Sequence, residues 1–524
     1  MNRTTVGALV VFLVGVIVIA GVYLWKQSVE ESTEISTSDA ARAQGTITIG
    51  VDNFVGYFPL CSPHMHQLML ADGWALDCVD DSADYAGRFS RLQSGELDLA
   101  VATVDSYVLG GQRANYPAVI VAVIDASMGG DAILAREEVA TSLTDLRDRP
   151  GLRVAYTPNS PSHHLLKAVG IDFDVPFFGT QEGAARQIET NGSEEARRLL
   201  VSGDADIAVL WEPDVSRALA EDGIVSLLGS EQTSGLIVDI LLANRDYQNN
   251  HPDRVQLLLE NYFRTLKYYQ DNPEDFNAAI ATSADVPADL AEHMRNGVAW
   301  ANLTENATAW LGVRVPNRVP QYGLIDTIGS TVRILIGFGD VPASPLPGGD
   351  PRRIINSEAV ATLYSQGIQP DAGTGGTFLQ EASASSLEAD FPPLADAGWD
   401  RLREVATLQV RPIHFQSGVN TLTREDKEQL DQAAQALENY PAFRIEVQGH
   451  TSLQGDPEAN RQLSQARARA VAQYLQVTYG IDADRIRVVG LGSTAPLPQR
   501  PGEPFRSYRD RLARVEIHLK SEEY

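Results

Sequence analysis

Cysteine and basic residues are scarce in this sequence. Only two cysteines, Cys61 and Cys78, occur among 524 residues, which excludes a multi-cysteine zinc scaffold and an iron–sulfur cluster. Lys and Arg number 42 against 69 Asp and Glu, so the net charge is −27 at pH 7. A chain this acidic lacks the cations that nucleic-acid phosphates require, and it would not be held electrostatically on an anionic membrane surface. No nucleic-acid partner is therefore expected.

Apolar residues form one long run near the start of the chain, Val6–Trp25 (VGALVVFLVGVIVIAGVYLW). About 20 helical residues at about 1.5 Å each span roughly 30 Å, the thickness of the hydrocarbon core of a bilayer. A cleaved signal peptide is the alternative, although its apolar core is normally only about 7–15 residues long. The run predicts a transmembrane signal anchor at residues 6–25, with a cytoplasmic stub at 1–5 and a polar linker at 26–45. The bulk of the chain would then lie in the periplasm, held by a single pass through the inner membrane.

The middle of the chain alternates strand-like runs with segments of helical spacing. This alternation predicts an α/β fold with parallel sheets, in which ligands bind at the carboxyl ends of the strands. The predicted strands are Thr46–Val51, Leu97–Val104, Ala118–Ile124, Leu152–Tyr156 and Asp206–Leu210, and the predicted helices include His163–Val169 and Arg254–Tyr269.

Two related phrases occur in this region, LQSGELD at Leu92–Asp98 and LVSGDAD at Leu200–Asp206. Each reads as a helix end with a glycine cap, followed by a turn into a strand. Together with their surroundings they resemble the type II periplasmic binding proteins, in particular the nitrate, sulfonate, taurine and thiamine-pyrimidine binders. The resemblance implies a two-lobed, hinged domain over residues 46–368 that closes on a small solute for ABC-type transport or for sensing. The stretches that carry it are residues 87–106, 143–166 and 194–214.

Polar and aromatic side chains follow several of these predicted strands or begin the helices between them. Each of them alone could be a turn residue, a helix cap or a core aromatic. As a set they are rich in carboxylates and aromatics and contain no Arg or Lys, which favours a nitrogenous or cationic ligand over an oxyanion held only by helix amino termini. The candidate ligand-binding residues are Asp52, Asn53, Tyr57, Asp105, Ser106, Tyr107, Thr157, Asn159, Ser160, Trp211, Glu212, Asp214 and Asp239.

The two cysteines lie 17 positions apart, early in this domain. In an oxidising periplasm Cys61 and Cys78 are expected to form a disulfide. A soft-metal site is the alternative, because the segment Cys61–His66 (CSPHMH) brings sulfur and imidazole ligands close together in sequence. The chain contains no Gly-x-Ser-x-Gly motif and no evident Ser/His/Asp set, so no enzyme, metal or cofactor is expected.

The C-terminal region follows a segment rich in Gly, Ser, Ala, Pro and acids, which predicts a linker at residues 369–398. Beyond it, the pattern predicts the order β-α-β-α-β-β, an α+β unit with two helices on one mixed sheet. The predicted strands are Leu408–Phe415, Arg444–Gln448, Arg485–Val489 and Val515–Leu519, with helices around Leu430–Tyr440 and Leu463–Tyr474.

Four stretches of this region, IHFQSGVNTLT (413–423), residues 445–475, RIRVVGLGSTAPL (485–497) and RVEIHL (514–519), resemble the OmpA-like peptidoglycan-binding domain. The resemblance implies a domain at residues 399–524 whose groove grips the diaminopimelate carboxylates of the peptide stem. Arg467 matches the arginine of that groove, whereas Ser452 stands where the family has Asp and cannot pair with an ammonium group. The implied contact residues are Gly449, His450, Thr451, Ser452, Asn460, Leu463, Arg467 and Arg514.

Taken together, these features predict an inner-membrane-anchored solute-binding protein that also binds peptidoglycan. An inner-membrane permease or a signalling protein is the expected partner. A structural tether whose two-lobed domain binds a protein is the alternative, and an enzyme of the pyrimidine-synthesis type ranks third.

Overall fold

A computed structural model of the chain describes residues 43–147, 149, 151–173, 175, 178, 186–314, 321–367, 391–409, 413, 415 and 421–522. The predicted cytoplasmic stub, the predicted membrane span at residues 6–25 and most of the linker at 26–45 lie outside these described residues. Within the described part of the chain, no helix is both long and apolar enough to cross a membrane.

The first lobe is built on a six-stranded sheet in the order β11-β4-β10-β3-β1-β2. Its central strands are almost wholly apolar and buried, as expected for a sheet covered on both faces. Strand β1 pairs in parallel with β2 and β3, whereas β10 runs antiparallel to β3 and β4. The strands are β1 (Gly45–Val51), β2 (Trp74–Asp80), β3 (Leu99–Thr103), β4 (Ala118–Ser127), β10 (Val238–Asn244) and β11 (Val298–Trp300).

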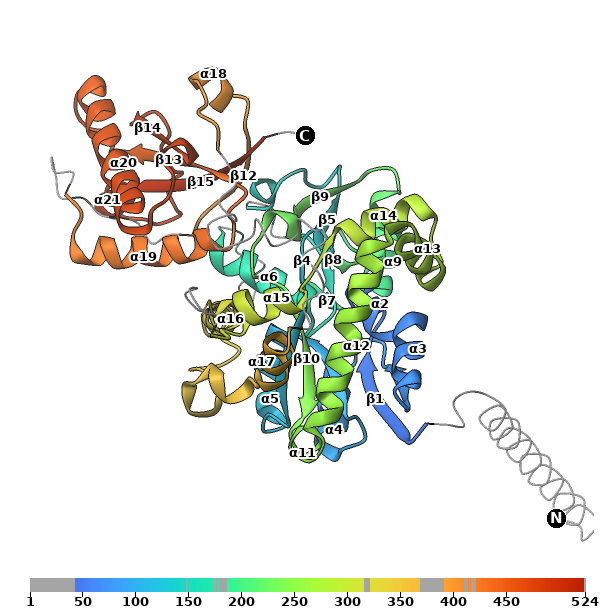
Figure 1. Cartoon of the computed structure of the whole chain (residues 1–524). Helices are drawn as coiled ribbons and strands as arrows, with labels where there is room; N and C mark the ends of the chain where they lie inside the picture. The colour runs from blue at the N-terminus through green and yellow to red at the C-terminus, as the bar shows by residue number, and fades with distance from the viewer. Residues whose placement is uncertain are drawn as a thin grey trace, which may run out of the picture.

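Helices cover both faces of this sheet (Figure 1). The glycine cap predicted in LQSGELD is confirmed, since α4 ends at Gly95 in the left-handed conformation with φ 75°. The helices of this lobe are α2 (Phe58–Cys61), α3 (Pro63–Ala71), α4 (Tyr85–Ser94), α5 (Val104–Arg113), α11 (Arg245–Asn250), α12 (Pro252–Asp271), α13 (Pro273–Ala284), α14 (Ala288–Asn296), α15 (Leu303–Glu305), α16 (Gly323–Phe338) and α17 (Glu358–Ser365).

The second lobe has a five-stranded sheet in the order β7-β6-β8-β5-β9. The second predicted glycine cap is also confirmed, because α9 ends at Gly203 with φ 81°. Its elements are β5 (Asp131–Arg136), η3 (Leu143–Leu146), β6 (Val154–Tyr156), α6 (Pro161–Asp172), β7 (Gln187–Glu189), α9 (Ser193–Ser202), β8 (Ile207–Trp211), α10 (Asp214–Leu219) and β9 (Ile224–Gly229).

Two short crossovers, residues 128–130 and 230–237, connect the lobes. Ser230 joins the two crossovers, since its Oγ accepts hydrogen bonds from the N–H groups of Gly129 at 2.7 Å and Asp131 at 3.1 Å. Helix α16 bridges the lobes as well, with Ile328 in the core of the first lobe and Ile334 in that of the second.

The predicted parallel sheets are wrong in part. Strand β10 in the first lobe and β5 in the second run antiparallel to their neighbours. Each of these two strands follows a crossover, so the chain enters the other lobe at the cleft and runs away from it, opposite to the adjacent strands. The alternating α/β pattern therefore gives two mixed sheets, one in each lobe.

The C-terminal domain has the predicted mixed sheet, in the order β12-β15-β13-β14. Helix α20 packs on β13 and β14, and α19 packs on α20. The sequence missed α18 and α21 because both are short. The elements are α18 (Asp396–Trp399), β12 (Arg403–Thr407), α19 (Arg424–Glu438), β13 (Arg444–His450), α20 (Pro457–Tyr479), β14 (Ile486–Gly492), α21 (Phe505–Leu512) and β15 (Val515–Ser521).

Two boundaries near the start of this domain differ from prediction. The first strand, expected at residues 408–415, lies at β12, and Leu408 instead forms a bridge with Phe173 of the second lobe. Phe391 and Trp399 lie 5.1 and 5.6 Å from the guanidinium of Arg444, so residues 391–399 pack on the domain rather than serve as linker. Most of the predicted linker, residues 369–390, lies outside the described residues.

The predicted disulfide is confirmed: Cys61 at the end of α2 is bonded to Cys78 in β2. The alternative soft-metal site is therefore not formed by Cys61. Among the described residues, no group of three or more His, Cys, Asp or Glu side chains is arranged to hold a metal ion.

Candidate functional site

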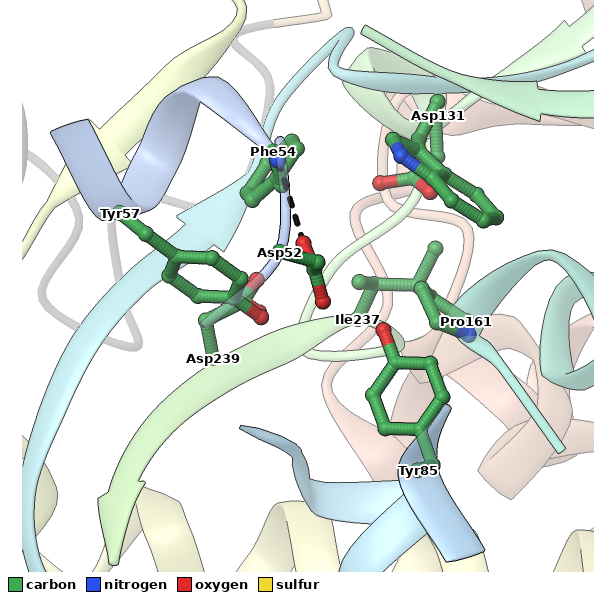
Figure 2. Close-up of a pocket in the computed structure, with 9 residues that line it drawn as sticks. Asp52, Phe54, Tyr57, Tyr85, Asp131, Pro161, Ile237 and Asp239 are labelled. Atoms are coloured by element: carbon green, nitrogen blue, oxygen red, sulfur yellow. Dashed lines mark hydrogen bonds between the residues drawn. The ribbon is translucent and has the colours of Figure 1, made fainter. Parts of the chain in front are cut away.

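A small hollow, which we call the cavity, lies between the two lobes, and its lining side chains surround about 220 Å³ of space that is partly open to solvent (Figure 2). Side chains converge on it from the segment after β1, the start of α4 and the start of β10 in the first lobe, from β5, α6 and β8 in the second, and from the crossover before β10. It contains carboxylates and aromatic rings, and none of its lining residues is Lys, Arg or His. The lining residues are Asp52, Phe54, Tyr57, Tyr85, Asp131, Pro161, Trp211, Ile237 and Asp239.

Asp52 is fixed by the turn that follows β1. Its Oδ1 accepts a hydrogen bond from the backbone N–H of Phe54 at 3.1 Å (Figure 2). Its Oδ2 lies 3.0 Å from Nη2 of Arg88, a fully buried arginine on α4 that also binds Asp81. Arg88 does not line the cavity, so it neutralises Asp52 from behind and leaves the cavity itself without a cation.

Asp239 and Asp125 are paired in register on neighbouring strands β10 and β4, and both are buried. The hydroxyl of Tyr57 donates a hydrogen bond to Asp239 Oδ1. Burial raises the pKa of both carboxyls well above their ordinary value, and their mutual repulsion raises the pKa of Asp239 further. Asp239 Oδ2 is buried without a hydrogen-bond partner among the described residues.

Asp131 begins β5 and approaches the cavity from the second lobe. Only 1% of its surface is exposed, and its Oδ1 has no hydrogen-bond partner in the described part of the chain. Burial raises the pKa of Asp131 to about 7, and the nearby carboxylates of Asp105 and Glu212 add to the shift. A bound cation would supply the partner that this oxygen lacks.

Two further buried carboxyls lie near the cavity without lining it. Burial raises the pKa of Glu212 to about 7 and that of Asp105 to about 6. Glu212 accepts hydrogen bonds from the hydroxyl and N–H of Ser216, and Asp105 Oδ1 is buried without a partner among the described residues. The cleft therefore holds an excess of buried acids.

The sequence-predicted residues fall into two groups. Four of them line the cavity, namely Asp52, Tyr57, Trp211 and Asp239. Asn53 connects the two lobes at the edge of the cavity, because Oδ1 of Asn53 accepts a hydrogen bond from Nε1 of Trp211 at 3.4 Å.

The remaining candidates serve the ends of elements or the core. Tyr107 is a buried residue of α5, and its hydroxyl donates a hydrogen bond to the carbonyl of Ala118 at 2.6 Å. Asp214 forms an ion pair with Arg197 at 2.9 Å. Ser106 caps α5, while Thr157, Asn159 and Ser160 form the turn before α6.

Sequence reasoning missed five lining residues. Asp131 directly follows Gly129-Gly130, and this position after two glycines was the one sequence signal that could have identified it. The others are aromatic or apolar residues whose neighbours across the cleft come from distant segments. They are Phe54, Tyr85, Pro161 and Ile237.

The C-terminal domain brings the implied groove residues together at the carboxyl end of β13. The guanidinium of Arg467 lies 5.0 Å from the ring of Phe415, and its side chain is mostly buried. Gly449 allows close packing of α20, since a Cβ there would lie 2.1 Å from the carbonyl oxygen of Ser464. Ser452 lies two residues after the end of β13, and Leu463 is half-buried on α20.

Other implied groove residues hold the sheet and the loop in place. Glu516 accepts a hydrogen bond from Nε of Arg514 at 2.7 Å, and its Oε2 lies 3.1 Å from Nε2 of His450. Burial opposes ionisation of Glu516, but its hydrogen bonds to His450, His518 and Arg514 prevail and lower its pKa. The N–H of Thr451 donates to the carbonyl of Gly492, and Asn460 Nδ2 donates to the carbonyl of Gln454.

Comparisons with known proteins match both parts of the chain. Residues 81–309 match the family described as ABC transporter, phosphonate, periplasmic substrate-binding protein, and residues 414–508 match the OmpA family. The alkanesulfonate-binding protein SsuA from Xanthomonas axonopodis pv. citri, solved bound to MOPS, superposes with a TM-score of 0.45 at 16% identity, covering 58% of this chain and 96% of SsuA.

Curated relatives match through the C-terminal region. The probable lipoprotein YiaD of Escherichia coli (strain K12) is 39% identical over 85 residues, which are 16% of this chain and 38% of YiaD. The peptidoglycan-binding protein ArfA of Mycobacterium tuberculosis (strain ATCC 25618 / H37Rv) is 34% identical over 106 residues, which are 20% of this chain and 32% of ArfA. The chain thus spans less than two fifths of the length of either relative. Both resemblances seen in the sequence are confirmed: the chain joins a domain of the periplasmic substrate-binding type to a C-terminal OmpA-like domain.

Proposed function

We propose that this protein is a cell-envelope solute-binding protein that captures a small nitrogenous or cationic ligand and is held on peptidoglycan by its C-terminal domain. The observation that carries the proposal is the cavity between the lobes, where the buried carboxylates Asp52, Asp131 and Asp239 face aromatic rings. A ligand in this position contacts both lobes at once, so its binding favours the closed arrangement.

The charge of the cleft favours a cation. Phosphonate, named in the description of the matching family, is an anion, and it would meet carboxylates where it needs donors. An ammonium, guanidinium or protonated ring nitrogen would instead supply donors to Asp131 Oδ1 and Asp239 Oδ2, two oxygens of the cavity lining that have no hydrogen-bond partner among the described residues.

The aromatic walls favour an organic cation over a metal ion. Tyr57, Tyr85 and Trp211 present rings to the cavity, and ring faces attract a positive charge within about 6 Å. The lining side chains leave room for about one water molecule in this arrangement, so a ligand must be small and the lobes must part to admit it.

Peptidoglycan binding is supported by the OmpA-like domain and by the position of Arg467. A guanidinium can bind a carboxylate through two parallel hydrogen bonds, which suits the carboxylates of a peptide stem. Ser452 in place of an acid leaves no anion there for an ammonium group. We expect the C-terminal domain to bind peptidoglycan mainly by recognising carboxylates of the peptide stem.

The N-terminal run at residues 6–25 would anchor the protein in the inner membrane, with the linker at 26–45 leading to the solute-binding domain at 46–368 and a further linker before the domain at 399–524. An inner-membrane permease or a signalling protein would then receive the bound ligand. Tethering at both ends favours local delivery or sensing over free diffusion.

Thermal-shift screening of the full chain tests the ligand class. The panel contains primary amines, guanidinium compounds, quaternary ammonium compounds and aminopyrimidines, with phosphonates, sulfonates and nitrate as the opposing arm. Stabilisation by cations alone supports the proposal, whereas stabilisation only by the oxyanions contradicts it. If nothing shifts the melting curve while a membrane protein copurifies, the structural-tether alternative is favoured instead.

A pulldown on purified sacculi tests the wall contact. The full chain should sediment with the sacculi and should be released by competing peptide stems. Failure to sediment would refute wall binding and leave the solute-binding part of the proposal to the thermal-shift result.

A further inference from the structure

The C-terminal domain is packed against the second lobe rather than suspended from the end of the chain (Figure 1). One continuous cluster of buried apolar side chains runs from α6 of the second lobe into the C-terminal sheet and helices. At its centre the rings of Phe173 and Tyr440 lie 4.7 Å apart, and Phe173 forms a backbone bridge with Leu408. Separating these surfaces would expose apolar core to water, which is costly.

Polar contacts at Asp172, the last residue of α6, fix this junction. The buried carboxylate accepts hydrogen bonds from the hydroxyl of Tyr440 at 3.2 Å and from Nη1 of Arg333 at 3.1 Å. The backbone carbonyl of Asp172 accepts from the N–H of Gln409 at 2.8 Å. Three segments, from the second lobe, α16 and the C-terminal domain, therefore meet at one residue.

A second group of contacts surrounds the first. Arg147 Nη2 donates to Thr407 Oγ1 at 2.6 Å, which links η3 to β12. Asn439 accepts at its carbonyl from the N–H of Ser234 at 2.9 Å and at Oδ1 from the hydroxyl of Ser330 at 3.2 Å. The junction thus rests on the second lobe, the 230–237 crossover and α16.

The N-terminal side of the chain joins the other lobe. Strand β1 lies inside the sheet of the first lobe between β2 and β3, and Gln44 N donates to the carbonyl of Gly73 just before it. Figure 1 shows the start of β1 and the C-terminal domain at opposite ends of the molecule. The N-terminal attachment therefore acts on the first lobe, and the C-terminal attachment acts on the second lobe and on α16, the helix that bridges both lobes.

We propose that the two lobes lie in series between membrane and wall, so that separation of these two layers pulls the cleft open and lowers its occupancy. This inference rests on the proposed function, because it uses its membrane anchor and its wall contact. By reciprocity, a ligand that closes the cleft resists the separation. The site would then couple solute capture to the spacing of the cell envelope.

The contacts across the cleft are weaker than the junction. Opening the lobes breaks single polar contacts such as Trp211 to Asn53 at 3.4 Å and Arg217 to the carbonyl of Ala284 at 2.8 Å, and it leaves both crossovers intact. The ion pair between Lys167 and Asp340, 2.7 Å long, joins α6 to the end of α16 and would resist the motion. Under load the cleft is therefore expected to yield before the junction does.

The test is a single-molecule pulling experiment on the full chain in a nanodisc, with handles on engineered cysteines. The native cysteines are bonded to each other, so thiol coupling reaches only the introduced positions. One variant carries Gln44→Cys and Val477→Cys, on the first lobe and the C-terminal domain. The matched control carries Val201→Cys and Val477→Cys, on the second lobe and the C-terminal domain. Gln44, Val201 and Val477 are all exposed.

The expected result is a reversible extension step, below the unfolding force, with the 44/477 handles and no such step with the 201/477 handles. A low-force step with the 201/477 handles would mean that the junction yields first, and it would overturn the inference. Absence of a step with both pairs would mean that the lobes do not separate, which also overturns it. No ligand or sacculus is present, so failure of the proposed function would show in its own assays and not in this one.

Discussion

Arg88 lies directly behind Asp52, with Nη2 3.0 Å from the carboxylate oxygen Oδ2 and no exposed surface of its own. The same guanidinium binds Asp81 and donates to the carbonyl of Val101. Replacing it by Gln would leave buried carboxylates without a counter-charge. We expect Arg88→Gln to lower the free energy of unfolding by about 3–5 kcal/mol, measured by denaturant unfolding.

Arg91 provides the matched control, because it binds the same Asp81 at 2.7 Å from a partly exposed position. Arg91→Gln should lower the free energy of unfolding by less than about 1 kcal/mol. Equal losses for the two variants would mean that burial of Arg88 beneath the cleft has no special role.

The buried acids of the cleft predict an unusual dependence of stability on pH. Burial raises the pKa of Asp131 and Glu212 to about 7, whereas an unfolded chain ionises both near pH 4. Between these values the folded state retains protons that the unfolded state has lost. Each of these two acids therefore contributes a loss of stability as pH rises from about 4 to about 7, of about 1.4 kcal/mol per pH unit for each retained proton. Burial lowers the pKa of His163 to about 2 and that of His164 to about 3, so these two residues contribute the opposite slope up to about pH 6.5.

Scanning calorimetry at pH 5, 6 and 7 measures this slope, and Asp131→Asn isolates one of the acids. The variant should show a shallower fall in melting temperature than the unaltered chain. Burial opposes ionisation of Glu404, but its hydrogen bonds to His518 and Lys520 prevail and lower its pKa to about 2. Glu404 therefore changes the stability only below about pH 4.5, outside the range of this measurement. An equal change of melting temperature with pH in the variant and in the unaltered chain would contradict the assignment.

Asp239→Asn removes a carboxyl that could ionise beside a bound cation, with little change of shape. We expect it to weaken binding of an organic cation identified by thermal shift by about 30-fold or more, since a buried charge contact is lost. Isothermal titration gives the affinity. Asp253→Asn is the matched control, because it makes the same change of charge at an exposed position in the first turn of α12. Equal affinities for the two variants would place the ligand elsewhere.

Much of the fold could be predicted because the relevant signals are local. Buried apolar runs identified β1, β3, β4, β6 and β8, and glycine caps marked the ends of α4 and α9. The direction of β5 and β10 could not be predicted in this way, because it depends on the chain crossing twice between the lobes. The position of β12 depends likewise on Leu408 pairing with Phe173, a contact between segments far apart in sequence.

The candidate site was predictable to the extent that its residues follow strand ends. Asp52 and Trp211 were found in this way and line the cavity, whereas Asp239 was named without a predicted strand and lies near the start of β10. Tyr85 and Asp131 were missed because they reach the cavity only after the lobes are brought together. The excess of acids was visible in the sequence, whereas the position of Arg88 behind Asp52 required the folded structure.

The disulfide between Cys61 and Cys78 closes a short loop at the edge of the first lobe. For a sequence separation of 17, the loss of loop entropy in the unfolded chain corresponds to about 3 kcal/mol. The double variant Cys61→Ser, Cys78→Ser should therefore melt at a lower temperature than the unaltered chain. A reductant should reproduce this loss in the unaltered chain and leave the double variant unchanged. If the reductant lowered both melting curves equally, its effect would not come from this bond.

Wall binding is expected to depend on Arg467 more than on the surface charge of α20. Arg467 is buried beside Phe415, where a guanidinium is held in a fixed orientation for a carboxylate, whereas Arg469 is exposed two positions further along the helix. Arg467→Ala should reduce retention on sacculi by at least tenfold, and Arg469→Ala should change it less than twofold. Arg467→Lys keeps the charge but loses the fork of donors, so an intermediate retention would identify bidentate recognition. Equal loss for Arg467→Ala and Arg469→Ala would instead identify a contact made by overall charge, which an acidic chain of net charge −27 is poorly suited to make.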